Sequence, residues 1–123
     1  MEIIKATFDT GNSSGLKKVF NAQNSTSESL KNLNEDFVIR VTDILVYEDT
    51  INSFGSDQKG DVVVLFSEVD GVETLYGSVS KSVSESAQSL IDFMQMTETD
   101  AVDVKVIKRV SNNGRDFISL QMV

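Results

Sequence analysis

The amino-acid sequence predicts a mainly β domain that contains one amphipathic helix. Three observations support this fold class. Runs of β-branched and aromatic residues recur from residue 36 to the C-terminus, and turn residues separate them. One segment, residues 80–96, changes to the spacing of a helix. The chain has 123 residues and is 40% hydrophobic, which is enough for one domain with a buried core.

Residues 1–34 are predicted to form a partly ordered N-terminal extension, and residues 35–123 the main domain. The extension is rich in Ser, Thr, Asn and Gly from residue 9 onward. The segment LKKVFNAQ, residues 16–23, interrupts this composition and is strand-like.

The first strand of the main domain is expected at DFVIRVTDILVY, residues 36–47. Phe37, Ile39 and Val41 occupy one parity of the strand, whereas Ile44 and Val46 occupy the other. A change of phase inside one strand predicts a bulge or bend that re-aims the side chains, and barrels use such bends to turn a corner.

A polar stretch with two glycines, residues 47–61, is predicted to be a loop. It carries Phe54, which has no apolar neighbour nearer than Ile51. Such a ring either packs beneath its own loop or stays available for a flat ligand to stack on it. Both interpretations fit the sequence at this point.

Two further strands are expected at VVVLF, residues 62–66, and VETLYG, residues 72–77. The first is a continuous apolar run, typical of a strand buried over most of its length. Asp70-Gly71 predicts a hairpin turn between them. A two-residue turn would place Glu68 opposite Glu73, an unfavourable pair, so the sequence leaves the register open.

The helix is predicted over residues 80–96, SKSVSESAQSLIDFMQM. Ser82 followed by Glu85 matches a capping box near its start. One apolar stripe follows helical spacing and comprises Val83, Ala87, Leu90, Ile91 and Met94.

Two final strands, VDVKVIKRV and RDFISLQMV, are joined by SNNG. A three-residue turn, with Gly114 in the left-handed conformation, pairs Val104 with Met122 and Val106 with Leu120, which gives one apolar face. The opposite face then carries Lys105, Ile107, Arg109, Phe117, Ser119 and Gln121.

The predicted order is therefore three strands, a helix and two strands, with a bend in the first strand. This is the order of the OB-fold, a five-stranded Greek-key barrel, although other small α+β domains share it. We expect an OB-fold-like barrel with one helix between strands three and four, preceded by the N-terminal extension.

Composition excludes several classes of activity. The chain has no cysteine and no histidine, which removes disulfides, thiolate metal sites, Ser-His-Asp and Cys-His catalysis, and the usual zinc ligands. Acid pairs such as Glu35/Asp36 and Glu48/Asp49 point to opposite faces of a strand, so neither forms a catalytic or metal site alone. We expect no enzyme activity and no cofactor. No signal peptide or membrane-spanning run is apparent, so an intracellular protein is expected.

The net charge of −8 is distributed unevenly. Residues 1–34 sum to +1, residues 35–100 to −11 and residues 101–123 to +2. The acidic middle motivates one hypothesis, an acidic protein whose ligand is another protein, with mimicry of DNA as one form of it.

The OB-fold motivates a different hypothesis, binding of single-stranded nucleic acid, which needs flat rings for bases and cations for phosphates. Its ligand crosses strands two and three between the loops after strands one and four. The tyrosines also fit half-buried strand aromatics, and Arg109 opposite Phe117 also fits an ordinary cation–π pair. The candidate contacts are Tyr47, Phe54, Tyr76, Lys59, Lys105, Arg109, Arg115 and Phe117, with Lys17 and Lys18 on the extension as further candidates.

Several segments, spread in order over nearly the whole chain, resemble the single-stranded-DNA-binding proteins of small podoviruses that replicate linear genomes by protein priming. These segments are KATFDT (5–10), KKVFNAQ (17–23), SLKNL (29–33), LYGSVSKSVSESAQSLID (75–92), VKVI (104–107) and FISLQ (117–121). The match is weaker over residues 34–70.

The resemblance implies a protein that binds single-stranded DNA without strong sequence preference. Such a protein coats and protects displaced strands during phage DNA replication in the host cytoplasm. Phage DNA polymerase machinery is a further candidate partner, and no membrane partner is expected. In the phage context, the alternative hypothesis becomes an acidic phage protein that binds a host protein, as a DNA mimic in one version. The resemblance also implies stacking roles for Tyr47 and Tyr76, which fall at matching tyrosines, and for Phe54, which falls where the family has tyrosine.

Overall fold

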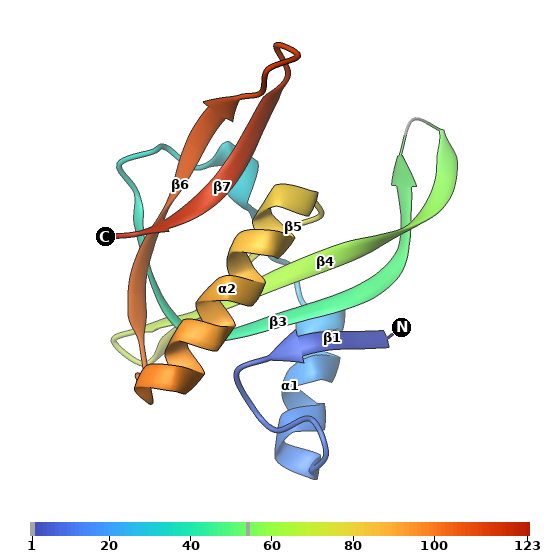
Figure 1. Cartoon of the computed structure of the whole chain (residues 1–123). Coiled ribbons are helices and arrows are strands. Elements are labelled where there is room, and N and C mark those ends of the chain that lie inside the picture. The colour runs from blue at the N-terminus through green and yellow to red at the C-terminus, as the bar shows by residue number, and fades with distance from the viewer. Residues whose placement is uncertain (1, 54) are drawn as a thin grey trace.

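The computed structural model describes residues 2–53 and 55–123. They form a mainly β structure, as predicted, in which one curled sheet packs against two helices (Figure 1). In chain order the elements are β1 (Glu2–Ala6), α1 (Ser13–Asn24), β2 (Glu28–Ser29), the short 3-10 helix η1 (Leu30–Asn32), β3 (Val38–Ser53), β4 (Ser56–Val69), β5 (Val72–Ser78), α2 (Lys81–Thr97), β6 (Val102–Val110) and β7 (Asp116–Met122). None of the helices in the described ranges is long and apolar enough to cross a membrane.

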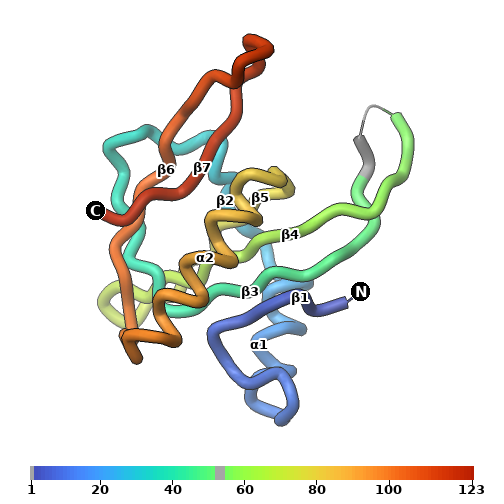
Figure 2. Tube along the Cα trace, viewed as in Figure 1, coloured from blue at the N-terminus to red at the C-terminus, as the bar shows by residue number. Residues whose placement is uncertain are grey.

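The strands follow the order β2-β5-β4-β3-β6-β7, and β1 pairs with β3 outside this path. The tube in Figure 2 shows β2 beside β5, with which it pairs in parallel, whereas the other pairs are antiparallel. The β3–β4 and β6–β7 hairpins project as two arms on the same side of the molecule (Figure 1). Among the described residues, β2 and β7 are the two ends of this path, and the sheet between them is curled like half of a barrel (Figure 1).

The bend predicted in the first strand of the main domain is confirmed. Val41 pairs with Ser67 and Asp43 with Phe66, so β3 has one extra residue, Thr42, between them. Before this bulge β3 pairs with β6, and after it with β1. The bulge therefore sends one long strand into two parts of the sheet.

The prediction of a loop over residues 47–61 is wrong. β3 continues to Ser53, β4 begins at Ser56, and the two strands pair along the whole stretch. Gly55 has a positive φ of 80° at the turn. This ribbon extends beyond the core and is largely polar, so it lacks the apolar alternation by which a strand is recognised in sequence.

The strand expected at residues 16–23 is also wrong, because this segment lies in α1. The Asn12 side chain caps the helix, accepting a hydrogen bond of 2.8 Å from the backbone N–H of Gly15. Gly15, Val19 and Ala22 are its buried residues, at a spacing of four and three. This is the period of a helix packed by one face, and the neighbouring polar residues obscure it in a short window.

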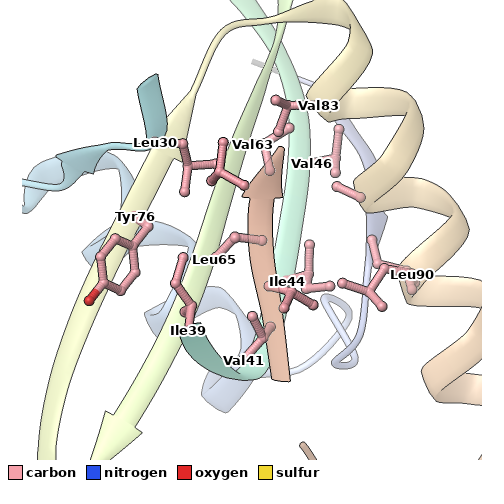
Figure 3. Close-up of a cluster of buried hydrophobic side chains, with 14 of the residues drawn as sticks. Leu30, Ile39, Val41, Ile44, Val46, Val63, Leu65, Tyr76, Val83 and Leu90 are labelled. Atoms are coloured by element: carbon pink, nitrogen blue, oxygen red, sulfur yellow. The ribbon is translucent and has the colours of Figure 1, made fainter. Parts of the chain in front are cut away.

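Residues 1–34 contribute to the sheet and to the core. β1 pairs with β3, and Leu30 of η1 is fully buried. The α2 side of the sheet holds the larger core cluster, part of which Figure 3 shows; it includes Leu30, Ile44, Leu65, Tyr76 and Leu90. A second cluster lies on the α1 side. The division of the chain at residue 34 stays a prediction.

The register predicted for the final hairpin is confirmed. Val104 pairs with Met122, Val106 with Leu120 and Arg109 with Phe117. Gly114 has a φ of 76°, as the three-residue turn requires.

The hairpin at Asp70-Gly71 has the two-residue turn, and both turn residues have positive φ. Glu68 therefore does lie opposite Glu73, and both side chains are exposed, where water screens their repulsion.

The predicted helix and its buried stripe are confirmed, but the capping box is wrong. Ser80 is the N-cap residue, and Ser82 lies inside the first turn. The Ser82 hydroxyl instead donates a hydrogen bond of 2.5 Å to the carbonyl oxygen of Ile118, which joins α2 to β7. The hydroxyl thus bonds to a strand distant in sequence rather than to the first turn of its own helix.

Candidate nucleic-acid interface

The two tyrosines predicted as stacking residues lie on opposite faces of the sheet. Tyr47 pairs with Val62, and Tyr76 pairs with Leu65. Because Val62 and Leu65 are three residues apart on one strand, their side chains point to opposite faces. Tyr47 accordingly belongs to the α1-side cluster and Tyr76 to the α2-side cluster.

Both tyrosine rings are largely enclosed, each with 7% of its surface exposed. Burial raises the pKa of Tyr47, and the carboxylate of Asp49 raises it further. The pKa of Tyr76 is raised by burial first and by Glu28 second. Figure 3 shows the Tyr76 hydroxyl oxygen pointing away from the labelled apolar side chains, so the edge of the ring approaches the surface while its faces are packed.

Phe37 is a surface aromatic that the sequence analysis did not select. Its ring lies 6.1 Å from the Tyr76 ring between centroids, with a tilt of 54°, and 44% of the residue is exposed. Strand alternation predicts that Phe37 points to the same face as Ile39, which is buried. Its position just before β3 begins, where the sheet no longer covers both sides, explains the difference.

The remaining predicted residues divide between the two arms. Lys59 lies on the β3–β4 arm, and its Nζ is 3.9 Å from Glu48 Oε1. On the β6–β7 arm Arg109 and Arg115 are exposed, whereas Lys105 and Phe117 are partly buried. Phe54, predicted as a stacking residue in the loop of residues 47–61, lies outside the described residues.

Lys18 is engaged in contacts within the protein although its side chain is partly exposed, whereas Lys17 is exposed on α1. Lys18 forms an ion pair with Asp43, whose other oxygen accepts a 2.7 Å hydrogen bond from the hydroxyl of Thr7. Its Nζ also lies 5.2 Å from the centre of the Phe8 ring. Among the described residues, cation–π contacts involve Lys18 alone, so Arg109 does not lie over the Phe117 ring.

A cleft of about 670 Å³ lies between the end of β5 and the β6–β7 arm. We name it the seam cleft, because residues from both ends of the strand order, β2 and β7, line it. Its lining residues are Ser29, Lys31, Ser78, Val79, Ser80, Lys108, Arg109, Val110, Asp116, Phe117 and Ile118. The structure thus brings Arg109 and Phe117 together, as predicted from their register.

A second groove, of about 330 Å³, lies beside Tyr47 between the end of α1 and the β4–β5 strands. It shares Ser29, Ser78 and Val79 with the seam cleft. The two hollows are therefore adjacent at the end of β5, and Tyr47 lines one of them while Phe117 lines the other.

Lys31 and Lys108 line the seam cleft but were missed by the sequence analysis. Lys31 lies in η1, within the segment predicted as an extension. Lys108 alternates with Val104 and Val106 along β6, so the sequence assigned it to the apolar face of that strand. Lys108 is exposed although Val106, two residues before it, is buried, because β6 extends beyond the core at this point. The cluster of basic residues at 105, 108, 109 and 115 was the available signal.

The sequence profile of a family described as "Phage Single-stranded DNA-binding protein" matches residues 1–123. The chain is 38% identical over 120 residues to a "Single-stranded DNA-binding protein" of Bacillus phage PZA, which covers 98% of this chain and 94% of the relative. The corresponding protein of Bacillus phage phi29 is 37% identical with the same coverage, and that of Bacillus phage B103 is 34% identical, covering 98% and 96%. No solved structure matches the chain.

Proposed function

We propose, from the premise that this chain belongs to the phage single-stranded DNA-binding protein family, that it binds single-stranded DNA without strong sequence preference. In this proposal it coats displaced strands during phage DNA replication in the infected cell and protects them. It acts by binding, without catalysis or a cofactor. The full-length family match is the observation that carries the proposal.

The arrangement of the surface supports this function. Sequence-tolerant binding of unpaired strands combines cations that follow the phosphates with rings on which bases stack. The predicted contacts, Tyr47, Phe54, Tyr76, Lys59, Lys105, Arg109, Arg115 and Phe117, remain part of the proposal. Phe37 joins them, because its exposed ring beside Tyr76 is more accessible to a base than the Tyr76 ring itself.

We also propose that β3, β4, β5, β6 and β7 with α2 form a variant of the OB-fold, left open at the seam cleft. The element order and the bulged first strand support this fold. The phage DNA polymerase machinery is a proposed partner, encountered at the fork where displaced strands appear.

A competition experiment tests the function. A fluorescent oligo-dT strand is titrated with the protein, and its anisotropy is followed while unlabelled single strand or duplex of equal length is added. We expect the single strand to compete at much lower concentration than the duplex. Equal competition would contradict the preference for unpaired strands. A flat titration would contradict nucleic-acid binding and favour the acidic protein-binding hypothesis.

A further inference from the structure

The seam cleft concentrates positive charge in a chain that is acidic overall. Lys31, Lys108 and Arg109 line it, and Asp116 is the one acidic residue among its lining residues. The whole chain has 19 acidic and 11 basic residues. Because a net charge of −8 repels a polyanion at long range, a local excess of cations determines where one can approach.

The three cations of the cleft are available to a ligand. Within residues 2–53 and 55–123, none of their charged side-chain groups lies within 4.0 Å of a carboxylate, whereas those of Lys5, Lys18 and Lys59 each do. The Glu35 carboxylate is near Lys108, but it accepts a 2.9 Å hydrogen bond from the backbone N–H of that residue. Lys31 is held in place by its neighbour Leu30, which is fully buried in the core. The backbone that carries the Lys31 side chain is therefore fixed by packing of its neighbour in the core.

One wall of the cleft is the free edge of β7. Farther along this edge, α2 covers the strand: Ser82 donates to the Ile118 carbonyl oxygen, and the Leu120 N–H donates to Ser86 Oγ at 3.4 Å. The backbone of Asp116 points to the same edge, because outward groups alternate along an edge strand. The ring of Phe117 is half-buried beside it.

We infer that the seam cleft holds the backbone of bound single-stranded DNA, with Lys31, Lys108 and Arg109 contacting phosphates. The strand passes Phe117 and leaves across Val79 toward the groove beside Tyr47. This inference rests on the proposed function and deepens it, because it assigns Lys31 and Lys108 a role and gives the strand a path. A cleft of this volume is within the usual range for ligand sites.

The absence of cysteine allows a site-specific test. Val79→Cys places a single thiol in the cleft, and Val69→Cys places one at the distant β4–β5 turn. The two positions are matched, with 56% and 55% of the valine exposed. Each variant is labelled with an environment-sensitive fluorophore and titrated with oligo-dT, while a gel shift measures binding independently.

We expect the Val79→Cys label to change its emission, or to weaken the gel shift, while the Val69→Cys label does neither. A normal gel shift with no response at position 79 would overturn the path through the cleft and leave the proposed function standing. Absence of a gel shift from the unlabelled protein would instead overturn the proposed function.

A charge substitution tests Lys31 separately. Each phosphate contact to a single strand contributes about 0.7 to the log–log salt slope, which corresponds to about 5-fold in affinity at about 0.1 M salt. Lys31→Gln should therefore bind about 5-fold more weakly and flatten the slope by about 0.7.

Arg40→Gln is the matched control for net charge. Arg40 is exposed and pairs with Asp103, about 20 Å along β6 from Arg109. We expect Arg40→Gln to leave the affinity and the salt slope nearly unchanged. Equal effects of the two substitutions would show that only net charge matters, and would contradict a phosphate contact at Lys31.

Discussion

Tyr47 and Tyr76 are packed in different core clusters, and each has a carboxylate nearby, from Asp49 and Glu28 respectively. Low solvation and negative charge both oppose formation of a tyrosinate, which is why the pKa of each residue is raised. The hydroxyl groups are therefore neutral throughout the physiological range. A stacking contribution from either ring requires a local rearrangement that frees a ring face, because both residues are largely buried.

This burial predicts an alkaline loss of stability. A tyrosine whose folded-state pKa is raised stabilises the fold fully below its unfolded pKa of about 10, and this contribution is lost as pH rises through the folded value. We expect the free energy of unfolding to begin to fall above about pH 10. Absorbance of tyrosinate measures the titration directly, because the chain has two tyrosines and no tryptophan. A midpoint equal to that in denaturant would contradict the prediction.

Lys18 and Asp43 connect α1 to the bend of β3, and Thr7 joins the same network. The side chain of Asp43 is 20% exposed, so loss of its charge leaves partly buried donors without a strong acceptor.

We expect Asp43→Asn to lower the free energy of unfolding by roughly 1–3 kcal/mol, measured by urea titration. Asp92→Asn is the control, because Asp92 pairs with Lys5 but its side chain is 56% exposed. That change should cost less than about 0.5 kcal/mol. Equal effects would show that the network at the bend contributes no more than a surface ion pair.

At the scale of elements, α1 lies close against the loop that precedes it. Gly15 is buried in its first turn, and a Cβ added there would lie 1.7 Å from the backbone oxygen of Asp9. The close approach of two backbones, rather than helix propensity, requires glycine at this position.

We expect Gly15→Ala to destabilise the protein by about 2 kcal/mol or more, because the backbone of Asp9 must move. Ser14→Ala, at the neighbouring exposed position, should have little effect and serves as the control. Thermal unfolding followed by circular dichroism compares them. A Gly15→Ala protein that unfolds at the unchanged temperature would show that the loop yields without cost.

At the scale of the whole molecule, an acidic protein that binds an acidic ligand must obtain more of its binding free energy from stacking than from electrostatic attraction. Stacking contributes about 1–3 kcal/mol per base, and the cleft offers only a few cations. Affinity per molecule is then modest, and coverage of a long strand depends on high protein concentration or on contacts between neighbours.

This division predicts a shallow salt dependence. With three or four phosphates neutralised, the slope of log affinity against log salt should be about −2 to −3. Anisotropy titrations at several salt concentrations measure it. A slope steeper than about −6 would show that electrostatics, rather than the rings, provides most of the binding energy.

Much of the main domain could be predicted because its signals are local. The stripe from Val83 to Met94 follows helical spacing, and the phase change between Val41 and Ile44 marks the bulge. The turn at Gly114 was predictable because only one register gives the final hairpin an apolar face. The candidate site was harder to predict, because Lys31 and Phe117 meet across more than eighty residues of sequence.

The sequence by itself determined the mainly β class, the buried helix, the registers of the last hairpin and the family. Packing between distant segments decided the rest. Tyr47 and Tyr76 lie on opposite faces because they pair with β4 residues, Val62 and Leu65, whose side chains point to opposite faces. Lys18 is paired because the fold brings Asp43, at the bend of β3, next to it. A cleft exists only where strands fail to pair, and strand pairing is a property of the folded chain rather than of any one segment.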